Sequence, residues 1–126
     1  MKILVVDDEK DIQPLFEQRF RKEIRNHEME FAFAFSGEEA ISFLNSHNHE
    51  AVLILSDLNM PGMSGLELLK EIKEHFKTPP PFVMVITAYG DPENYNQAMR
   101  LGADDFLTKP INFEILKEKL KINTNG

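Results

Sequence analysis

Five short apolar runs, each followed by a stretch with a helical hydrophobic stripe, constrain the fold of this 126-residue chain more than any other feature. Short runs of Val, Ile, Leu and Phe are typical of strands that are buried on both faces. Strands that alternate with helices form a parallel sheet covered by helices on both sides. The sequence therefore predicts an α/β fold with the order βαβαβαβαβα. The predicted strands cover residues 2–6, 29–35, 50–56, 82–87 and 105–108.

Capping signals mark where the predicted helices begin and end. The segments SGEE (36–39) and SGLE (64–67) have the Ser-x-x-Glu form of a capping box. Asp91 is a suitable N-cap before Pro92 at the first helical position, and Gly102 is expected to end that helix. The predicted helices cover residues 11–25, 36–46, 64–76, 92–101 and 112–122, and residues 123–126 are expected to form a frayed tail.

The composition is that of one soluble globular domain, long enough to bury a core of its own. The absence of cysteine excludes disulfides, thiolate metal sites and a thiol nucleophile. A net charge of -7 argues against nucleic acid as a partner, and the basic cluster within residues 19–25 is interpreted as a solvated helix face. No apolar run reaches the ~20 residues of a membrane span or the ~7–15 of a signal peptide. We therefore expect a cytoplasmic protein with no membrane partner.

Polar side chains follow four of the five predicted strands. Asp7 and Asp8 end the first strand, Asp57 the third and Thr87 the fourth, and Lys109 follows the fifth. These residues should meet, because the carboxyl ends of parallel strands lie at one edge of a sheet. Three carboxylates in one crevice repel one another unless cations balance them, and Mg²⁺ or Mn²⁺ suits such oxygen ligands. An aspartate, a hydroxyl, an ammonium and a divalent ion together are suited to phosphoryl transfer onto the aspartate.

The segments that carry these residues resemble the receiver domain of two-component response regulators. They are LVVDDE (4–9), LSDLNMPGMSG (55–65), ITA (86–88) and GADDFLTKP (102–110), and the resemblance extends over essentially the whole chain. It implies a flavodoxin-like (βα)5 fold with the strand order 2-1-3-4-5 and a receiver domain over residues 1–122. It also implies that a sensor histidine kinase or a histidine phosphotransfer protein donates a phosphoryl group from phosphohistidine.

The resemblance assigns the phosphoryl group and the metal to particular residues. Asp57 would be the phosphorylated residue. Asp8 would bind Mg²⁺ directly, and Asp7 would act on the ion mainly through water. Asp57 itself and the backbone carbonyl of Asn59 would complete the protein ligands.

Further residues receive roles around the phosphoryl group. Lys109 would pair with the phosphoryl oxygens and Thr87 would hydrogen-bond to them. Phe106 matches the aromatic switch position but lacks the hydroxyl of Tyr, so a switch here must work by packing. The bond from Lys109 to Pro110 is often cis in the family. Tyr89 would sit at the mouth of the site, and we hypothesise that it slows attack of water on the acyl phosphate.

Two other functions compete with that of a receiver domain. A phosphatase of the haloacid dehalogenase type also places an Asp nucleophile at a strand end, but it needs a second Asp two residues later, where this chain has Asn59. We therefore expect no turnover enzyme, only a domain that catalyses its own phosphorylation and slow dephosphorylation. A nucleotide- or flavin-binding protein would need a Gly-rich loop after the first strand, where Asp-Asp-Glu stands instead.

Phosphorylation would add roughly one and a half to two negative charges and shift the populations of two existing states. The affected face would consist of the fourth predicted helix, the fifth strand and the last helix, about residues 92–121. We expect this face to control an effector, either a domain of a longer chain or a separate protein. A homodimer contact on the same face stays open.

Overall fold

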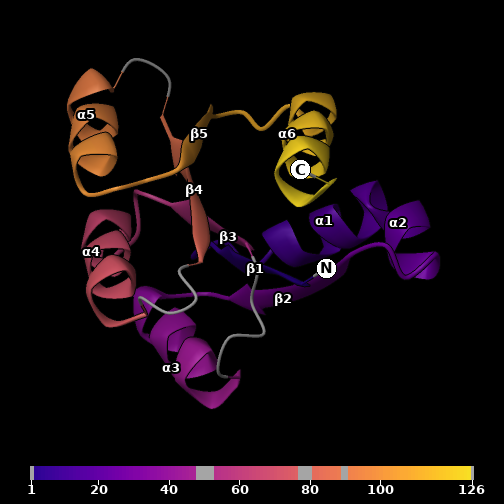
Figure 1. Ribbon diagram of the computed structural model, residues 1–126, viewed down its shortest axis with the longest axis horizontal. Coiled ribbons are helices and arrows are strands. Elements are labelled where there is room, and N and C mark those ends of the chain that lie inside the picture. The colour runs from indigo at the N-terminus through magenta and orange to yellow at the C-terminus, as the bar shows by residue number, and fades with distance from the viewer. Residues whose placement is uncertain (1, 48–52, 77–80, 89–90, 126) are drawn as a thin grey trace.

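Five parallel strands form a single sheet in the computed structural model, which describes residues 2–47, 53–76, 81–88 and 91–125 (Figure 1). The strand order is β2-β1-β3-β4-β5, and every neighbouring pair is parallel. This confirms the α/β flavodoxin-like fold and the predicted order. The strands are β1 (Lys2–Val6), β2 (Glu30–Ala34), β3 (Leu53–Asp57), β4 (Phe82–Thr87) and β5 (Asp105–Thr108).

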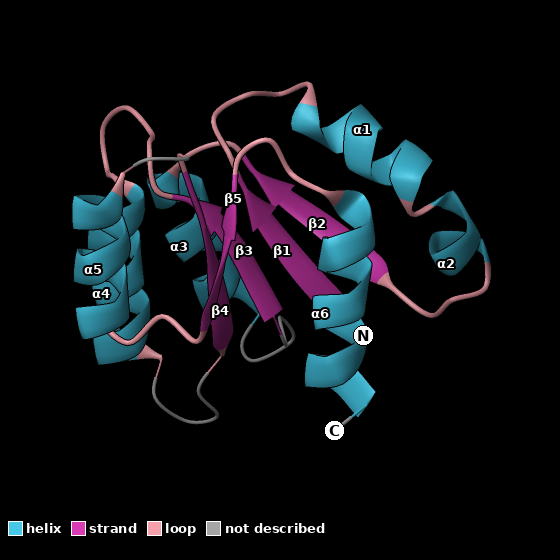
Figure 2. Ribbon diagram, turned by 90° about the horizontal axis from the view of Figure 1, so that it is seen from above, coloured by secondary structure: helices cyan, strands magenta, loops and turns pink. Residues whose placement is uncertain are grey.

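Helices cover both faces of the sheet, as Figure 2 shows from above. α3, α4 and α5 lie on one face, and α1, α2 and α6 lie on the other. None of the helices in the described part of the chain is long and apolar enough to cross a membrane. The helices are α1 (Ile12–Arg19), α2 (Arg21–Arg25), α3 (Gly37–His47), α4 (Gly65–His75), α5 (Pro92–Arg100) and α6 (Phe113–Asn125).

The prediction of one continuous helix over residues 11–25 is wrong. The backbone of Phe20 leaves the helical region at φ -108° and ψ 21°, which separates α1 from α2. Neither Gly nor Pro stands there, so the local sequence carries no signal for a break. The cause lies in the tertiary structure, where the fully buried ring of Phe20 packs against Phe16, Phe31 and Phe113.

The other helix ends follow the capping signals. Ser36 and Ser64 accept hydrogen bonds from the backbone N–H groups of Glu39 and Glu67, and Asp91 caps α5 in the same way. Gly102 follows α5 with φ +100°, a conformation that glycine adopts without strain. α6 is helical through Asn125, beyond the predicted end at residue 122. Residues 50–52 of the third predicted strand and Gly126 lie outside the described residues.

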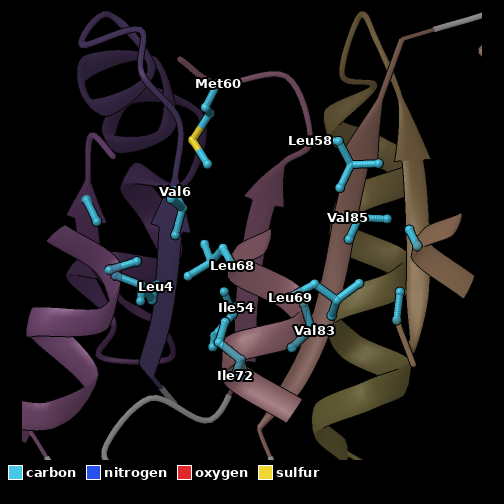
Figure 3. Packing of buried hydrophobic residues seen from close by; sticks show 14 of the residues in the cluster. Leu4, Val6, Ile54, Leu58, Met60, Leu68, Leu69, Ile72, Val83 and Val85 are labelled. Atoms are coloured by element: carbon cyan, nitrogen blue, oxygen red, sulfur yellow. The ribbon is translucent and has the colours of Figure 1, made fainter. Parts of the chain in front are cut away.

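Alternate residues of each strand enter two different cores. The first core lies beneath α3, α4 and α5, and it is mostly aliphatic (Figure 3). Leu4, Ile54 and Val83 of the sheet pack there against Leu68 and other side chains of α4. Burying each such side chain stabilises the fold by about 1.5–3 kcal/mol.

The second core lies beneath α1 and α6 and is rich in aromatic rings. Phe16 of α1 and Phe20, which follows α1, are fully buried, and their rings lie 5.7 Å apart. Phe113 of α6 meets Phe16 edge to face at 5.3 Å. Phe31 and Phe33 of β2 extend the cluster, so the alternating Phe residues of this strand pack beneath helices.

Candidate functional site

The carboxyl ends of β1, β3, β4 and β5 bring the predicted site residues to one edge of the sheet. Asp57 is the last residue of β3 and pairs in register with Ile86, and Thr87 ends β4 beside Thr108. Asp7 follows β1, and Lys109 follows β5. The backbone N–H of Lys109 donates to the carbonyl of Thr87 at 2.8 Å, which fixes the lysine beside β4. The Lys109–Pro110 bond is cis, as the family resemblance implied.

Asp57 is the most completely enclosed carboxylate of the site, with 1% of its surface exposed. One oxygen, Oδ2, accepts a hydrogen bond from Lys109 Nζ at 2.7 Å. The other, Oδ1, accepts from the backbone N–H of Asn59 at 3.0 Å. Both oxygens of the buried carboxylate therefore have donors, as an ionised group away from water requires.

Asp7 and Asp8 complete a cluster of three carboxylates with Asp57. One oxygen of each lies within 4.8 Å of the others. Asp7 is buried and Asp8 is exposed, so the cluster opens to solvent on the side of Asp8. Burial raises the pKa of Asp7 from 3.8 to about 6; the backbone N–H of Glu9 opposes this shift, and the charge of Asp57 adds to it.

The negative charge at this edge of the sheet exceeds the positive charge, which favours the binding of a divalent cation. Partial burial lowers the pKa of Lys109, but the hydrogen bond and the charge of Asp57 outweigh that effect and hold it above the usual value. Lys109 therefore stays protonated, but its single positive charge faces three carboxylates. Converging carboxylate oxygens are ligands that Mg²⁺ and Mn²⁺ prefer, so the residues fit such an ion. The side chains of Asp7, Asp8 and Asp57 could hold it.

The predicted switch residues lie beside the acidic cluster. Thr87 is 2% exposed, and its Oγ1 donates to the carbonyl of Leu107 over 3.5 Å. Phe106 is half-buried, and its ring meets that of Tyr95 edge to face at 4.7 Å. Thr87, Tyr95 and Phe106 line an open, mainly apolar pocket of about 620 Å³ between β5 and the start of α5. The switch position therefore borders free space into which side chains can move.

The loop between β3 and α4 is held by contacts that the sequence did not reveal. A Cβ on Gly65 would overlap the backbone carbonyl of Asp57 and the Cα of Leu58, so only glycine fits there. Glu38 of α3 accepts a hydrogen bond from the backbone N–H of Met63 at 3.2 Å. The sequence signal for both was present in the SGEE and SGLE segments, but capping was the only role assigned to them.

Two predicted site residues gain little or no support from the geometry. Asn59 is exposed, and its backbone N–H serves Asp57, while its carbonyl stays a predicted metal ligand. Tyr89 lies outside the described residues.

Together the fold and the site define a flavodoxin-like α/β domain with an acidic centre at the carboxyl edge of its sheet. Residues 3–121 match the family model for the response regulator receiver domain. This chain therefore belongs to the response regulator receiver domain family of two-component systems.

Individual relatives agree with the family. The chain is 41% identical over 87 residues to a cyclic di-GMP phosphodiesterase of Thermotoga maritima, which covers 69% of this chain and 22% of that protein. It is 32% identical over 121 residues to the response regulator RppA of Synechocystis sp., covering 96% of this chain and 49% of that one. The chain thus spans half or less of the length of these curated relatives. A receiver domain protein of Clostridium thermocellum has a similar structure, with a TM-score of 0.84, 30% identity and coverage of 98% and 94%.

Proposed function

We propose that this receiver domain accepts a phosphoryl group on Asp57 from phosphohistidine and holds it as a signal. The observation that carries the proposal is the environment of Asp57. Its carboxylate is buried, lies 2.7 Å from the ammonium of Lys109 and stands within a cluster of three carboxylates. An ionised carboxylate beside a fixed cation is a nucleophile placed where negative charge can be stabilised.

In the proposed reaction a carboxylate oxygen of Asp57 attacks the phosphorus of phosphohistidine. A P–O bond forms as the P–N bond breaks, and the imidazole nitrogen keeps the electron pair and takes a proton from solvent. Lys109 moves its hydrogen bond to a phosphoryl oxygen, and Thr87 gives its hydroxyl hydrogen bond to another. Lys109 already contacts Asp57, and the long bond from Thr87 to Leu107 is weak and is readily exchanged.

The carboxylates of Asp7, Asp8 and Asp57 and the carbonyl of Asn59 would hold Mg²⁺, with Mn²⁺ as a substitute. The ion would supply positive charge to the phosphoryl oxygens at the point where three carboxylates otherwise repel an anion. Asp7 and Asp8 keep that position negative and open to solvent at the side of Asp8.

The domain is proposed to store the phosphoryl group and not to turn over a substrate. Asn59 stands where a haloacid dehalogenase-type phosphatase has a second carboxylate, and an amide cannot act as general acid or base there. The family comparisons give that alternative no support. Slow dephosphorylation would then proceed by attack of water on the acyl phosphate.

The proposed output runs through the pocket beside Thr87. Movement of the Thr87 hydroxyl towards a phosphoryl group frees space for Phe106, whose ring now rests on Tyr95. The face formed by α5, β5 and α6 changes as a result and acts on an effector domain or protein. A homodimer through the same face is the second possibility for its partner.

Intact-protein mass spectrometry after treatment with acetyl phosphate and Mg²⁺ tests the proposal. We expect one added phosphoryl group on the wild type and none on Asp57→Ala or after chelation of the metal. Lys22→Ala, a change at an exposed position of α2, is the control that should phosphorylate normally. An unmodified wild type, or an adduct that persists in Asp57→Ala, would overturn the proposal.

A further inference from the structure

A groove with strongly basic walls lies at the opposite end of the sheet from Asp57. It has a volume of about 820 Å³ and runs between the end of α1, α2 and the middle of α6. Glu28 and Met29 of the lining directly precede β2, so the groove lies toward the amino ends of the strands. Six cationic side chains line this basic groove: Arg19, Arg21, Lys22, Arg25, Lys117 and Lys121.

The concentration of charge contrasts with the rest of the chain. The groove holds six of the fourteen Lys and Arg residues, together with only two carboxylates, Glu23 and Glu28. Its net charge is therefore +4, since six cations face two anions. The whole chain carries -7, so the residues outside the groove carry -11.

The walls of the groove are fixed by packing on the aromatic core. The guanidinium of Arg19 lies 5.3 Å from the ring centroid of Phe113, and the ammonium of Lys117 lies 5.3 Å from that of Phe20. Lys117 also pairs with Glu23 at 3.3 Å, which neutralises one of the two carboxylates. Ordered cations lose less entropy when a ligand binds, so these walls are preorganised.

Three cations of α2 have no such partner among the described residues. Arg21, Lys22 and Arg25 are exposed, and no described carboxylate lies within 4.0 Å of any of them. In a chain with an excess of acidic groups, three unpaired cations on five residues of helix are free to bind an anionic partner.

The lining selects among anionic partners. Glu28 and Glu23 interrupt the basic walls, and the acidic remainder of the chain repels a ligand of continuous negative charge such as nucleic acid. Met29 and the stems of the cations add apolar surface between the charges. Arginine binds carboxylates through two parallel hydrogen bonds. Spaced carboxylates separated by apolar groups fit this surface.

We propose that the basic groove binds an acidic segment of a partner protein, in which Asp and Glu alternate with apolar residues. The groove and Asp57 lie at opposite ends of the sheet, so a partner can occupy the groove while a phosphoryl donor reaches Asp57. This inference does not depend on the phosphorylation of Asp57.

Titration of the ¹⁵N-labelled domain with a short peptide of alternating Asp, Glu and Leu tests the proposal by NMR. We expect shift changes concentrated in residues 18–29 and 117–121, and binding that weakens as salt increases. A peptide with Asn and Gln in place of Asp and Glu is the matched control and should not bind. The absence of shifts with the acidic peptide, or equal shifts with the neutral one, would contradict the proposal.

Charge-reversal variants distinguish binding of the peptide in this groove from a general attraction of the peptide to cations. The double variant Arg21→Glu, Arg25→Glu should weaken peptide binding about tenfold or more, since each change removes a cation and adds a repulsive charge. Lys70→Glu with Arg100→Glu makes the same change of charge on exposed sites of α4 and α5 and should bind as the wild type does. Equal weakening by both variants would refute the groove as the binding site.

Two further outcomes are decisive. Lys22→Glu, a single change at an exposed position, repeats the test if the double variant does not fold, and it should weaken binding in the same direction. Tighter binding of ATP or of a short oligodeoxynucleotide at these residues than of the acidic peptide would overturn the assignment of a protein segment as the ligand.

Discussion

The two ends of the sheet carry opposite charges and hold them in opposite ways. At the carboxyl end, the carboxylates of Asp7 and Asp57 are buried, and the ammonium of Lys109 pairs with Asp57. At the amino end, the cations of α2 are exposed and water solvates them. The free energy of a buried charge depends on every neighbouring group, whereas that of a solvated charge depends on almost none. Substitutions at the carboxyl end of the sheet should therefore affect the protein strongly, and substitutions at the amino end should affect it weakly.

Removal of Lys109 should have the largest effect. Lys109→Met leaves Asp57 without its 2.7 Å partner and removes a donor to the phosphoryl group, so we expect phosphorylation by acetyl phosphate to slow about a hundredfold or more. The rate is measured by mass spectrometry against time. Lys22→Met removes an equal charge at the amino end of the sheet and should leave the rate unchanged. A similar loss of rate in both variants would contradict the contrast between the two ends.

The loop that supports Asp57 should tolerate even a methyl group poorly. Gly65→Ala places a Cβ against the backbone of Asp57 and Leu58, and we expect the free energy of unfolding to fall by about 3 kcal/mol. Urea denaturation measures the change. Gln18→Ala, on the wall of the basic groove, should stay within about 0.5 kcal/mol of the wild type. An unchanged midpoint for Gly65→Ala would show that the loop is not held as described.

Acid should stabilise the metal-free protein through Asp7. The pKa of Asp7 is about 6 in the folded state against 3.8 for the free group, so the folded state binds the proton more tightly. This contribution is complete below about pH 3.8 and is lost as the pH rises through 6. We expect the metal-free domain to gain about 2 kcal/mol from Asp7 as the pH falls from 7 towards 4.

Urea denaturation with chelator at several pH values measures this gain. Asp7→Asn should remove it, while Arg25→Gln should keep it. A pH dependence that is the same in Asp7→Asn as in the wild type would contradict the role given to burial. Mg²⁺ affinity should change in the opposite direction, because a protonated Asp7 is a poorer ligand.

The smallest predicted effect concerns the attack of water on phosphorylated Asp57. If Tyr89 shields the acyl phosphate, Tyr89→Ala should shorten the lifetime of phosphorylated Asp57 by roughly threefold. The lifetime is measured from the decay of the phosphorylated mass after acetyl phosphate is removed. The lifetime in Tyr89→Ala is compared with that in Tyr95→Ala, since Tyr95 packs on Phe106 at the pocket wall. A lifetime that is unchanged or longer in Tyr89→Ala refutes the shielding role.

The sequence predicted the sheet and its acidic edge because these depend on local patterns. Each strand is a short apolar run, and in four of the five a site residue ends the run or directly follows it, so Asp57 and Thr87 could be placed without tertiary information. The end of the first long helix could not be found in this way. The break at Phe20 arises where its ring enters a cluster of side chains from β2 and α6, which no local window contains.

Tertiary proximity also explains what was missed around the site and in the groove. Glu38 and Met63 are 25 residues apart, and their hydrogen bond depends on the packing of α3 beside the loop. The cluster within residues 19–25 was interpreted as a solvated helix face. Lys117 and Lys121 of α6 turn that face into one wall of a groove, and their distance along the chain hid the relation.

The bond from Thr87 Oγ1 to the carbonyl of Leu107 is 3.5 Å long, at the limit of a hydrogen bond. Such a bond holds the hydroxyl weakly, so little free energy is lost when the hydroxyl exchanges it for a bond to another acceptor. In the proposed switch a phosphoryl oxygen is that acceptor, so this bond opposes the shift between the two states only weakly. The contrast between the two states would then depend on the packing of Phe106 against Tyr95 more than on this one hydroxyl.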